Sequence, residues 1–130
     1  MGKLQGLNIQ QPWSQLILSG KKKVETREYP LPKKFYGKEL WLIETPGTSG
    51  KFKSRIIGKV LFVDCCEYKT KDDWEREKAL HLVETDDSNY GFREGKKKFG
   101  WVVGAVEAVD PFLAPSPRGI IYSGEIETPR

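Results

Sequence analysis

The chain contains little sulfur and almost no histidine: its 130 residues include two cysteines, one methionine and one histidine. Cys65 and Cys66 are adjacent in a segment typical of a β-strand, where neighbouring side chains point to opposite faces. This arrangement argues against a mutual disulfide, and we interpret both residues as small buried hydrophobic groups. With one histidine beside them, the ligands are too few for a structural zinc site. We therefore expect no metal and no cofactor, since a metal could enter only through carboxylates.

Long apolar runs are also missing from the sequence. No segment approaches the roughly 20 apolar residues of a membrane span, and the N-terminus lacks the apolar core of a signal peptide. We therefore expect a cytoplasmic protein with no membrane partner. The length of 130 residues and the lack of internal repeats favour a single domain over residues 1–130. We expect that domain to be a monomer.

Positive charge exceeds negative charge by only four, but it is clustered along the chain. Clusters of lysine suit a partner that carries phosphates, because neutralised phosphates release counterions. The alternative is an ordinary solvated basic surface. The clusters comprise Lys21 to Lys23, Lys33 and Lys34, Lys51 with Lys53 and Arg55, and Lys96 to Lys98.

Alternation of apolar and polar residues, together with β-branched segments, predicts five or six strands. They cover residues 4–9, 23–29, 39–45, 55–67, 99–109 and 120–126. Two short helices are expected, one after Pro12 and one over residues 72–83. The apolar stripe of the second helix would be Ala79, Leu80 and Val83. We therefore predict a mainly β fold with peripheral helices (α+β), in the form of a small, twisted β-barrel.

Local signals mark where these elements begin, bend and end. Gly20 occupies the position after the first helix that favours the left-handed conformation. Thr70 and Asp73 have the spacing of a capping box at the start of the second helix. Gly58 predicts a bulge or bend in the fourth strand, and Pro111 predicts the end of the fifth.

Ionisable side chains of both signs are concentrated directly after the first helix. Gly20, Lys22, Glu25 and Arg27 stand in the spacing Gly-x-Lys-x-x-Glu-x-Arg. On the second expected strand, Glu25 and Arg27 point to one face, where an unpaired buried charge would be costly. We therefore predict that they brace the rim of a polar pocket, and the turn-rich segment 46–50 is of the kind that borders such a site. The alternative is an exposed surface ion pair.

Together these features resemble the ASCH domain, a family within the PUA-like superfamily. The resemblance rests on the Gly-Lys-Glu-Arg signature, which follows a helix that opens with Gln11-Pro12-Trp13. The elements that follow also come in the family's order. They are a strand over residues 40–44, the strand with Gly58, and a late strand that begins with Trp101 and leads through a Pro-rich exit to Gly119. The likeness covers nearly the whole chain.

The resemblance implies a PUA-like barrel whose cleft accepts RNA or a modified nucleoside and is lined by Trp13, Gly20, Lys22, Glu25, Arg27 and Trp101. Lys22 can supply a point charge to a phosphate, or activate a neighbouring hydroxyl or water, and Arg27 presents a planar fork that suits a base edge or a carboxylate. Glu25 can accept a proton, or a hydrogen bond from an exocyclic amine. Trp13 and Trp101 are candidates for stacking on a base, with ordinary core positions as the alternative.

Some ASCH proteins are amidohydrolases that remove the acyl group from N4-acylated cytidine, using a threonine nucleophile, an activating lysine and a glutamate. In this chain the lysine falls at Lys22, but Glu25 occupies the threonine position, and Thr26 lies on the opposite face of the strand. Because a carboxylate cannot replace that nucleophile by the same route, the enzymatic alternative is Glu25 acting as a general base on water. Lys22 would then stabilise the developing oxyanion.

Other relatives are ribonucleases, for which a basic cleft and an acid/base pair would suffice. His81 is the sole histidine and could face the cleft or the solvent. A lone histidine on a helix is more often structural or solvent-facing than catalytic, so we assign it no catalytic role. The favoured hypothesis is a protein that binds RNA or a modified nucleoside. The alternative is a hydrolase of N4-acylated cytidine or of single-stranded RNA, with Lys22 and Glu25 as its catalytic residues. A third possibility is an interaction domain that has lost the pocket chemistry.

Overall fold

The computed structural model describes residues 4–46, 52–114 and 121–126, the last of these by their backbone. Residues 47–51, which include Lys51 and most of the loop expected to border the site, lie outside the described residues. So does Gly119.

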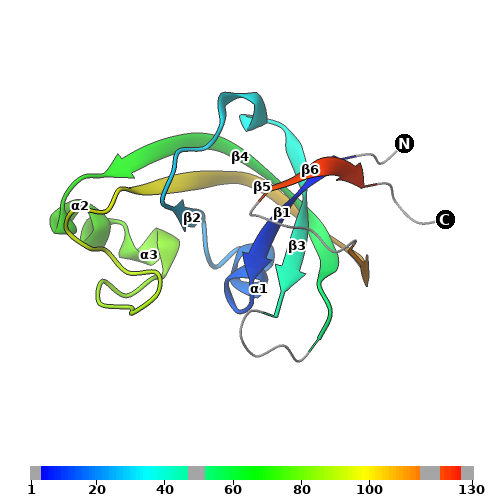
Figure 1. Ribbon diagram of the computed structural model, residues 1–130, viewed down its shortest axis with the longest axis horizontal. Coiled ribbons are helices and arrows are strands. Elements are labelled where there is room, and N and C mark those ends of the chain that lie inside the picture. Colours follow the sequence, from blue (N-terminus) through cyan, green and yellow to red (C-terminus); the bar gives the residue numbers. More distant parts are fainter. Residues whose placement is uncertain (1–3, 47–51, 115–120, 127–130) are drawn as a thin grey trace.

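Among the described residues six strands form one sheet, within the five or six that the sequence predicts. Their order across the sheet is β2-β5-β4-β3-β1-β6; β1 pairs in parallel with β3, and the other pairs are antiparallel. In Figure 1, β4 and β5 form a long arch, with α2 and α3 at one end and β1, β3 and β6 at the other. The strands are β1 (Leu4–Gln10), β2 (Val24–Arg27), β3 (Glu39–Thr45), β4 (Arg55–Tyr68), β5 (Lys98–Leu113) and β6 (Ile121–Ile126).

The mainly β, α+β class is confirmed, but the predicted closure into a barrel is wrong. Among the described residues the sheet has two edges, β2 and β6, and no strand pair joins them. The edge strand β2 has only four residues and ends just before the prolines at positions 30 and 32. A strand this short, with charged side chains beside it, leaves a gap in the sheet.

In the part of the chain that the structure describes, the helices differ in number from the two predicted. They are α1 (Trp13–Leu18), α2 (Lys71–Arg76), α3 (Lys78–His81) and a short 3-10 turn, η1 (Lys33–Phe35). The capping box of Thr70 and Asp73 is confirmed at the start of α2. The predicted single helix over 72–83 is interrupted at Glu77, where φ is −106° and ψ is 13°.

This interruption also changes which residues of the segment are buried. Ala79 and Leu80 are exposed, so two of the three residues in the predicted stripe are wrong. Val83 is buried as predicted, and Trp74 and His81 are buried in place of the other two, because Trp74 packs edge-to-face against Tyr68 of β4 and holds the segment against the sheet.

Irregular pairing shapes the two long strands. The pairing register shifts beside Gly58 on both sides of β4, which confirms the bulge. A Cβ at Gly58 would lie 2.5 Å from the backbone oxygen of Glu107, so the neighbouring chains meet closely there. The predicted end of the fifth strand at Pro111 is wrong: β5 runs to Leu113, because Pro111 falls in the irregular stretch where no ladder bond requires its missing N–H.

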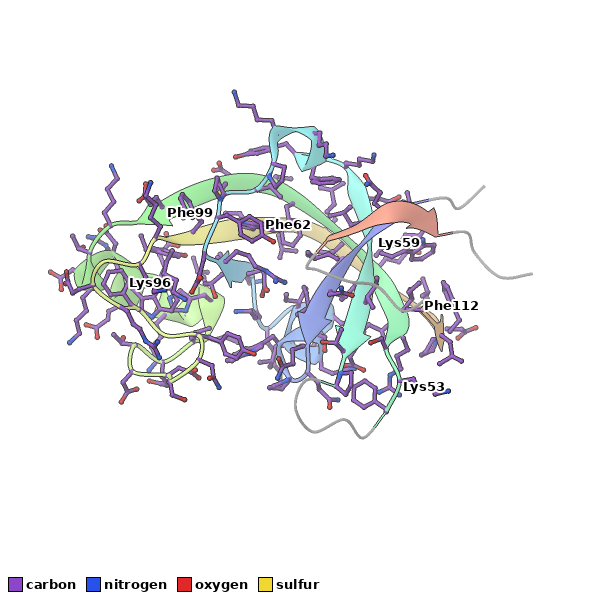
Figure 2. All side chains as sticks on the ribbon, in the orientation of Figure 1. Lys53, Lys59, Phe62, Lys96, Phe99 and Phe112 are labelled. Atoms are coloured by element: carbon purple, nitrogen blue, oxygen red, sulfur yellow. The ribbon has the colours of Figure 1, made fainter. Side chains whose placement is uncertain are left out.

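The main core lies between the sheet and α1. Trp101 is fully buried in it, and a second cluster of Tyr68, Trp74 and Val83 lies under α2 and α3. Figure 2 shows Phe62 and Phe99 along the arch of β4 and β5, with Phe112 toward the other end of β5. In the part of the chain that the structure describes, no helix has the length and apolar character needed to cross a membrane. The main cluster comprises Leu7, Ile9, Ile17, Leu31, Phe35, Leu40, Leu42, Ile57, Val60, Phe62 and Trp101.

Candidate functional site

Three residues of the signature converge on one place. The Arg27 Nη2 atom lies 2.7 Å from Oε2 of Glu25, and the Lys22 Nζ atom lies 4.0 Å from Oε1 of the same carboxylate. The exposed fractions of the three side chains are only 1% for Lys22, 8% for Glu25 and 12% for Arg27. They form a buried ionic cluster, because exposed ion pairs keep far more contact with water.

The chain reversal after α1 brings Lys22 under the helix. Ser19 ends α1, and Gly20 follows with a φ of +83°, the left-handed value predicted from the sequence. The Lys22 N–H then donates to the carbonyl of Leu16 over 2.9 Å. Gly20 does not line the cavity described below; its part in the site is to turn the chain so that Lys22 points inward.

The buried carboxylate of Glu44, on β3, holds α1 in position. Glu44 is fully buried and accepts hydrogen bonds from Ser14 Oγ at 2.7 Å and from Gln15 Nε2 at 2.8 Å, while Arg55 Nε donates to it at 2.9 Å. Burial acts to raise the pKa of this carboxyl, but the three hydrogen bonds and the Arg55 charge outweigh it, so the pKa lies below its usual value. Glu44 thereby fixes the helix that carries Trp13.

The cluster opens onto a cavity of about 370 Å³. This volume lies in the range of about 300–1,000 Å³ that is usual for small-molecule sites. The walls come from β1, α1, β2, the start of β5 and the loop after α3. The lining residues are Asn8, Gln10, Trp13, Lys22, Glu25, Thr26, Arg27, Glu28, Tyr29, Val83, Asn89, Tyr90 and Lys98.

Lys22 is the most deeply buried charge of the cavity wall. Its ammonium group donates to the backbone carbonyl of His81 and lies 4.9 Å from the centre of the Trp13 ring. Burial lowers the pKa of Lys22 to about 8, against the opposing charge of Glu25, and the Arg27 charge lowers it further. Near neutral pH the residue can therefore both carry a charge and give up a proton.

Arg27 is held by two of its neighbours and keeps one donor free. Its Nη2 atom donates to the backbone carbonyl of Asn8 over 2.9 Å as well as to Glu25, and its guanidinium carbon lies 5.7 Å from the centre of the Trp101 ring. The Nε atom is buried and has no hydrogen-bond partner among the described residues. A buried donor without a partner is costly, so this atom leaves Arg27 with an unsatisfied donor in a residue of the cavity wall.

The two candidate stacking residues lie in different places. Trp13 is partly buried and lines the cavity, where it packs edge-to-face against Tyr90 with ring centres 5.9 Å apart. Trp101 is fully buried in the core against Phe62 and Tyr29, and it presents no face to the cavity. Trp101 therefore supports Arg27 from behind and is not in position to stack on a bound base.

Sequence reasoning missed Tyr90 as a residue of the cavity wall. Its hydroxyl donates to Oε1 of Gln10 over 2.8 Å and joins the loop after α3 to β1. The only signal was a tyrosine in a polar segment expected to be irregular. Nothing in that local pattern indicated which distant strand the segment would contact.

His81 faces neither the cleft nor the solvent; of the readings weighed for it, the structural role is the one that the structure shows. It is fully buried; its Nε2 atom lies 2.9 Å from the carbonyl of Trp74, and the Val83 N–H donates to Nδ1 over 3.0 Å. Burial lowers the pKa of His81. These contacts fix the neutral ring with its proton on Nε2, and they position Val83 in the cavity wall.

The clustered lysines within the described residues differ in burial and in position. Lys22 is buried, and Lys98 is nearly so, with its Nζ atom 3.5 Å from Oε2 of Glu28. Figure 2 places Lys96 and Lys53 at opposite ends of the molecule. The two cysteines are free thiols, and no group of three or more potential His, Cys, Asp or Glu metal ligands occurs among the described residues.

Comparison with known proteins identifies the family. The family model of the ASCH domain matches residues 7–127, nearly the whole chain. The protein belongs to the ASCH domain family. The match includes every element that builds the cavity of this ASCH domain except the first residues of β1.

Solved structures share the fold of this ASCH domain. The ASCH protein of Zymomonas mobilis superposes with a TM-score of 0.67 at 19% identity, covering 87% of this chain and 75% of that one. A tyrosine-to-phenylalanine mutant of that protein gives the same TM-score and identity over 85% and 76%, and a serine-to-alanine mutant gives 0.65 over 86% and 75%. At this identity the likeness concerns the fold alone. A search of curated proteins finds no match.

Proposed function

We propose that this ASCH domain binds RNA or a modified nucleoside by taking one nucleobase into the cavity between β1 and β2. The observation that carries the proposal is the convergence of Lys22, Glu25 and Arg27 on one cavity, with the buried Nε of Arg27 left without a partner among the described residues. Membership of the ASCH family supports it, because RNA binding is a general property of that family.

The cavity offers complementary groups to such a ligand. Arg27 Nε supplies a directed donor, and the Glu25 carboxylate supplies an acceptor for an exocyclic amine. The exposed part of the Trp13 ring can stack on a base, an interaction worth about 1–3 kcal/mol where it occurs. The charges of the wall nearly cancel: Lys22, Arg27 and Lys98 face Glu25 and Glu28. A nearly neutral ligand part such as a base therefore fits the interior better than a phosphate group does.

Calorimetric titration tests this proposal directly. The purified protein is titrated with cytidine, uridine, adenosine, guanosine, N4-acetylcytidine and short single-stranded RNAs at low salt. We expect saturable binding of at least one of them, and binding of the RNAs that weakens as salt is added, because phosphate contacts release counterions. No binding by any of these compounds would contradict the proposal.

A specific observation also favours hydrolysis as a second candidate function. A lysine with a pKa of about 8 beside a buried carboxylate has the properties of an acid/base pair. Glu25 would accept a proton from the water that attacks the acyl carbon, and Lys22 would stabilise the oxyanion of the tetrahedral intermediate; Glu25 would then return that proton to N4 of cytidine as the C–N bond breaks. Thr26, next to Glu25, also lines the cavity.

Incubation with N4-acetylcytidine and with a labelled single-stranded RNA, each with and without a divalent ion, tests this second function. Release of acetate or of shorter RNA that disappears in Lys22→Ala would support it. Turnover that is unchanged in Lys22→Ala would rule out this pair as the catalytic residues.

A further inference from the structure

The edge strand β2 turns one row of its backbone groups away from the sheet. Within the described ranges it pairs with β5 alone, in a register that sets Val24 opposite Val102 and Thr26 opposite Gly100. One bond fixes the phase of this ladder: the Val103 N–H donates to the carbonyl of Lys23 over 2.9 Å. Because antiparallel residues alternate between bonded and non-bonded pairs, residues 23, 25 and 27 direct their backbone groups toward β5.

Thr26 therefore directs both its N–H and its C=O away from β5. No strand lies on that side of β2 among the described residues. No hydrogen bond from another described residue reaches either backbone group of Thr26. The N–H and the C=O stand side by side, as a donor and an acceptor that point in one direction.

The cavity lies along this free edge. Glu25, Thr26 and Arg27 of β2 and Glu28 just after it all line the cavity, although successive residues of a strand direct their side chains to opposite faces. A hollow lined by successive residues of a strand must border the edge between the two faces of that strand. The two backbone groups of Thr26 therefore open onto the cavity.

The cavity wall opposite β2 is formed by the end of β1, in the part of that strand that does not pair with β6. That pairing extends only from Leu4 to Leu7, whereas Asn8 and Gln10 line the cavity. The Arg27 side chain crosses from β2 to the carbonyl of Asn8. The cavity thus occupies the gap in the sheet between β2 and β1.

We propose that the main-chain N–H and C=O of Thr26 read the ligand of this site, which is therefore a planar ring with a hydrogen-bond acceptor and a donor at adjacent positions of one edge. The Watson–Crick edges of all four RNA bases have this pattern. Arg27 Nε, from the adjacent residue, adds a second donor. This inference rests on the proposed function, since it specifies how the base in that cavity is recognised.

Amide signals of the isotope-labelled protein test the inference during titration with the same nucleosides. We expect the Thr26 amide to shift strongly at saturation, and the amides of Glu25 and Arg27, which donate to β5, to shift less. 3-Methyluridine, which lacks the ring donor of uridine, should bind at least about tenfold more weakly if uridine binds. If no nucleoside changes any signal, the proposed function fails; if one changes the Trp13 and Arg27 side-chain signals but leaves the Thr26 amide in place, only this inference fails.

Two substitutions at one position separate main chain from side chain. Thr26→Pro removes an N–H that makes no ladder bond to β5, and an edge strand tolerates proline at such a position. Thr26→Val retains the N–H and removes only the hydroxyl. We expect Thr26→Pro to bind the nucleoside at least about tenfold more weakly than Thr26→Val. Equal affinities in the two variants would overturn the inference. If Thr26→Pro does not fold, the amide shifts of the unaltered protein decide.

Discussion

The Arg27 side chain joins two strands that do not pair: its Nη2 atom donates to the backbone carbonyl of Asn8 on β1 over 2.9 Å, while Arg27 itself belongs to β2. The same Nη2 atom contacts Glu25. A side chain thus takes the place of the backbone ladder that would close the sheet, and the space left beside it is the cavity. The open sheet and the cavity therefore both result from the absence of a backbone ladder between β2 and β1 in the described residues.

Replacing Arg27 by lysine should weaken ligand binding although it keeps the charge. An ammonium group cannot reach the Asn8 carbonyl and Glu25 in one plane and also present a donor like Nε to the cavity. We expect at least about a tenfold loss of affinity for the nucleoside that binds, measured by calorimetry. Arg76→Lys is the matched control, because Arg76 is largely exposed and pairs with Asp73 at the protein surface, and it should bind like the unaltered protein. Unaltered affinity in Arg27→Lys would contradict the role given to the guanidinium.

Replacing Lys22 by methionine should stabilise the protein at neutral pH and abolish the proposed function of the cavity. The pKa of Lys22 is about 8 in the folded protein, against an ordinary value of 10.5. Between pH 8 and pH 10.5 the unfolded chain therefore binds more protons than the folded protein does. The free energy of unfolding of the unaltered protein should therefore rise as the pH increases from 8 to 10.5. Below pH 8 the buried charge costs up to about 3 kcal/mol, which Lys22→Met removes.

Urea unfolding at several pH values between about 7 and 10.5 measures this difference. The stability advantage of Lys22→Met should be largest near neutral pH and shrink as the pH approaches the ordinary pKa of lysine. Lys23→Met is the control, since Lys23 is exposed and should show no such trend. A constant difference between Lys22→Met and the unaltered protein over the whole range would show that Lys22 is not a buried charge.

Replacing Glu44 by glutamine should destabilise the protein by about 2 kcal/mol, because one amide cannot accept from all three donors around it. The pKa of Glu44 is lowered in the folded state, so its stabilising effect is complete above the ordinary value of 4.5 and is lost as the pH falls below it. Thermal unfolding between about pH 3 and pH 7 should show a difference that narrows in acid. Glu39→Gln, at an exposed position of the same strand, should have little effect at any of these pH values. Equal stability of both variants at neutral pH would contradict the account of α1.

Replacing Gly58 by alanine should destabilise the fold by about 1–3 kcal/mol. The added Cβ would lie 2.5 Å from the Glu107 backbone oxygen and 2.8 Å from Cδ1 of Leu18. Leu18 can move, but the backbone of β5 cannot without disturbing the bulge. Chemical denaturation measures the loss, and an unchanged midpoint would mean that the bulge accommodates a side chain.

Much of the fold follows from local sequence because its signals act locally. The predicted limits of the third strand, residues 39–45, agree with β3, and the left-handed Gly20 and the capping box at Thr70 also appear as predicted. Each depends on residues within a few positions of one another. The break at Glu77 was missed because the packing of Trp74 on Tyr68, a contact with a separate strand, overrides the helical pattern there.

The site was predicted less completely, since it depends on contacts between distant segments. The spacing of Lys22, Glu25 and Arg27 indicated a shared pocket, because these residues lie within one turn and one strand. It could not show that Trp101 is turned into the core, or that Tyr90 reaches Gln10 across 80 positions. The open sheet was also beyond local reasoning, since closure depends on whether the first and last strands of the sheet meet.

A crystal structure of the protein with the nucleoside that binds most tightly tests the central claim most directly. We expect the base to lie in the cavity between β1 and β2, against Trp13 and within hydrogen-bond distance of Arg27 Nε and the Thr26 backbone. A ligand bound instead on an exposed lysine cluster, with the cavity empty, would contradict the account.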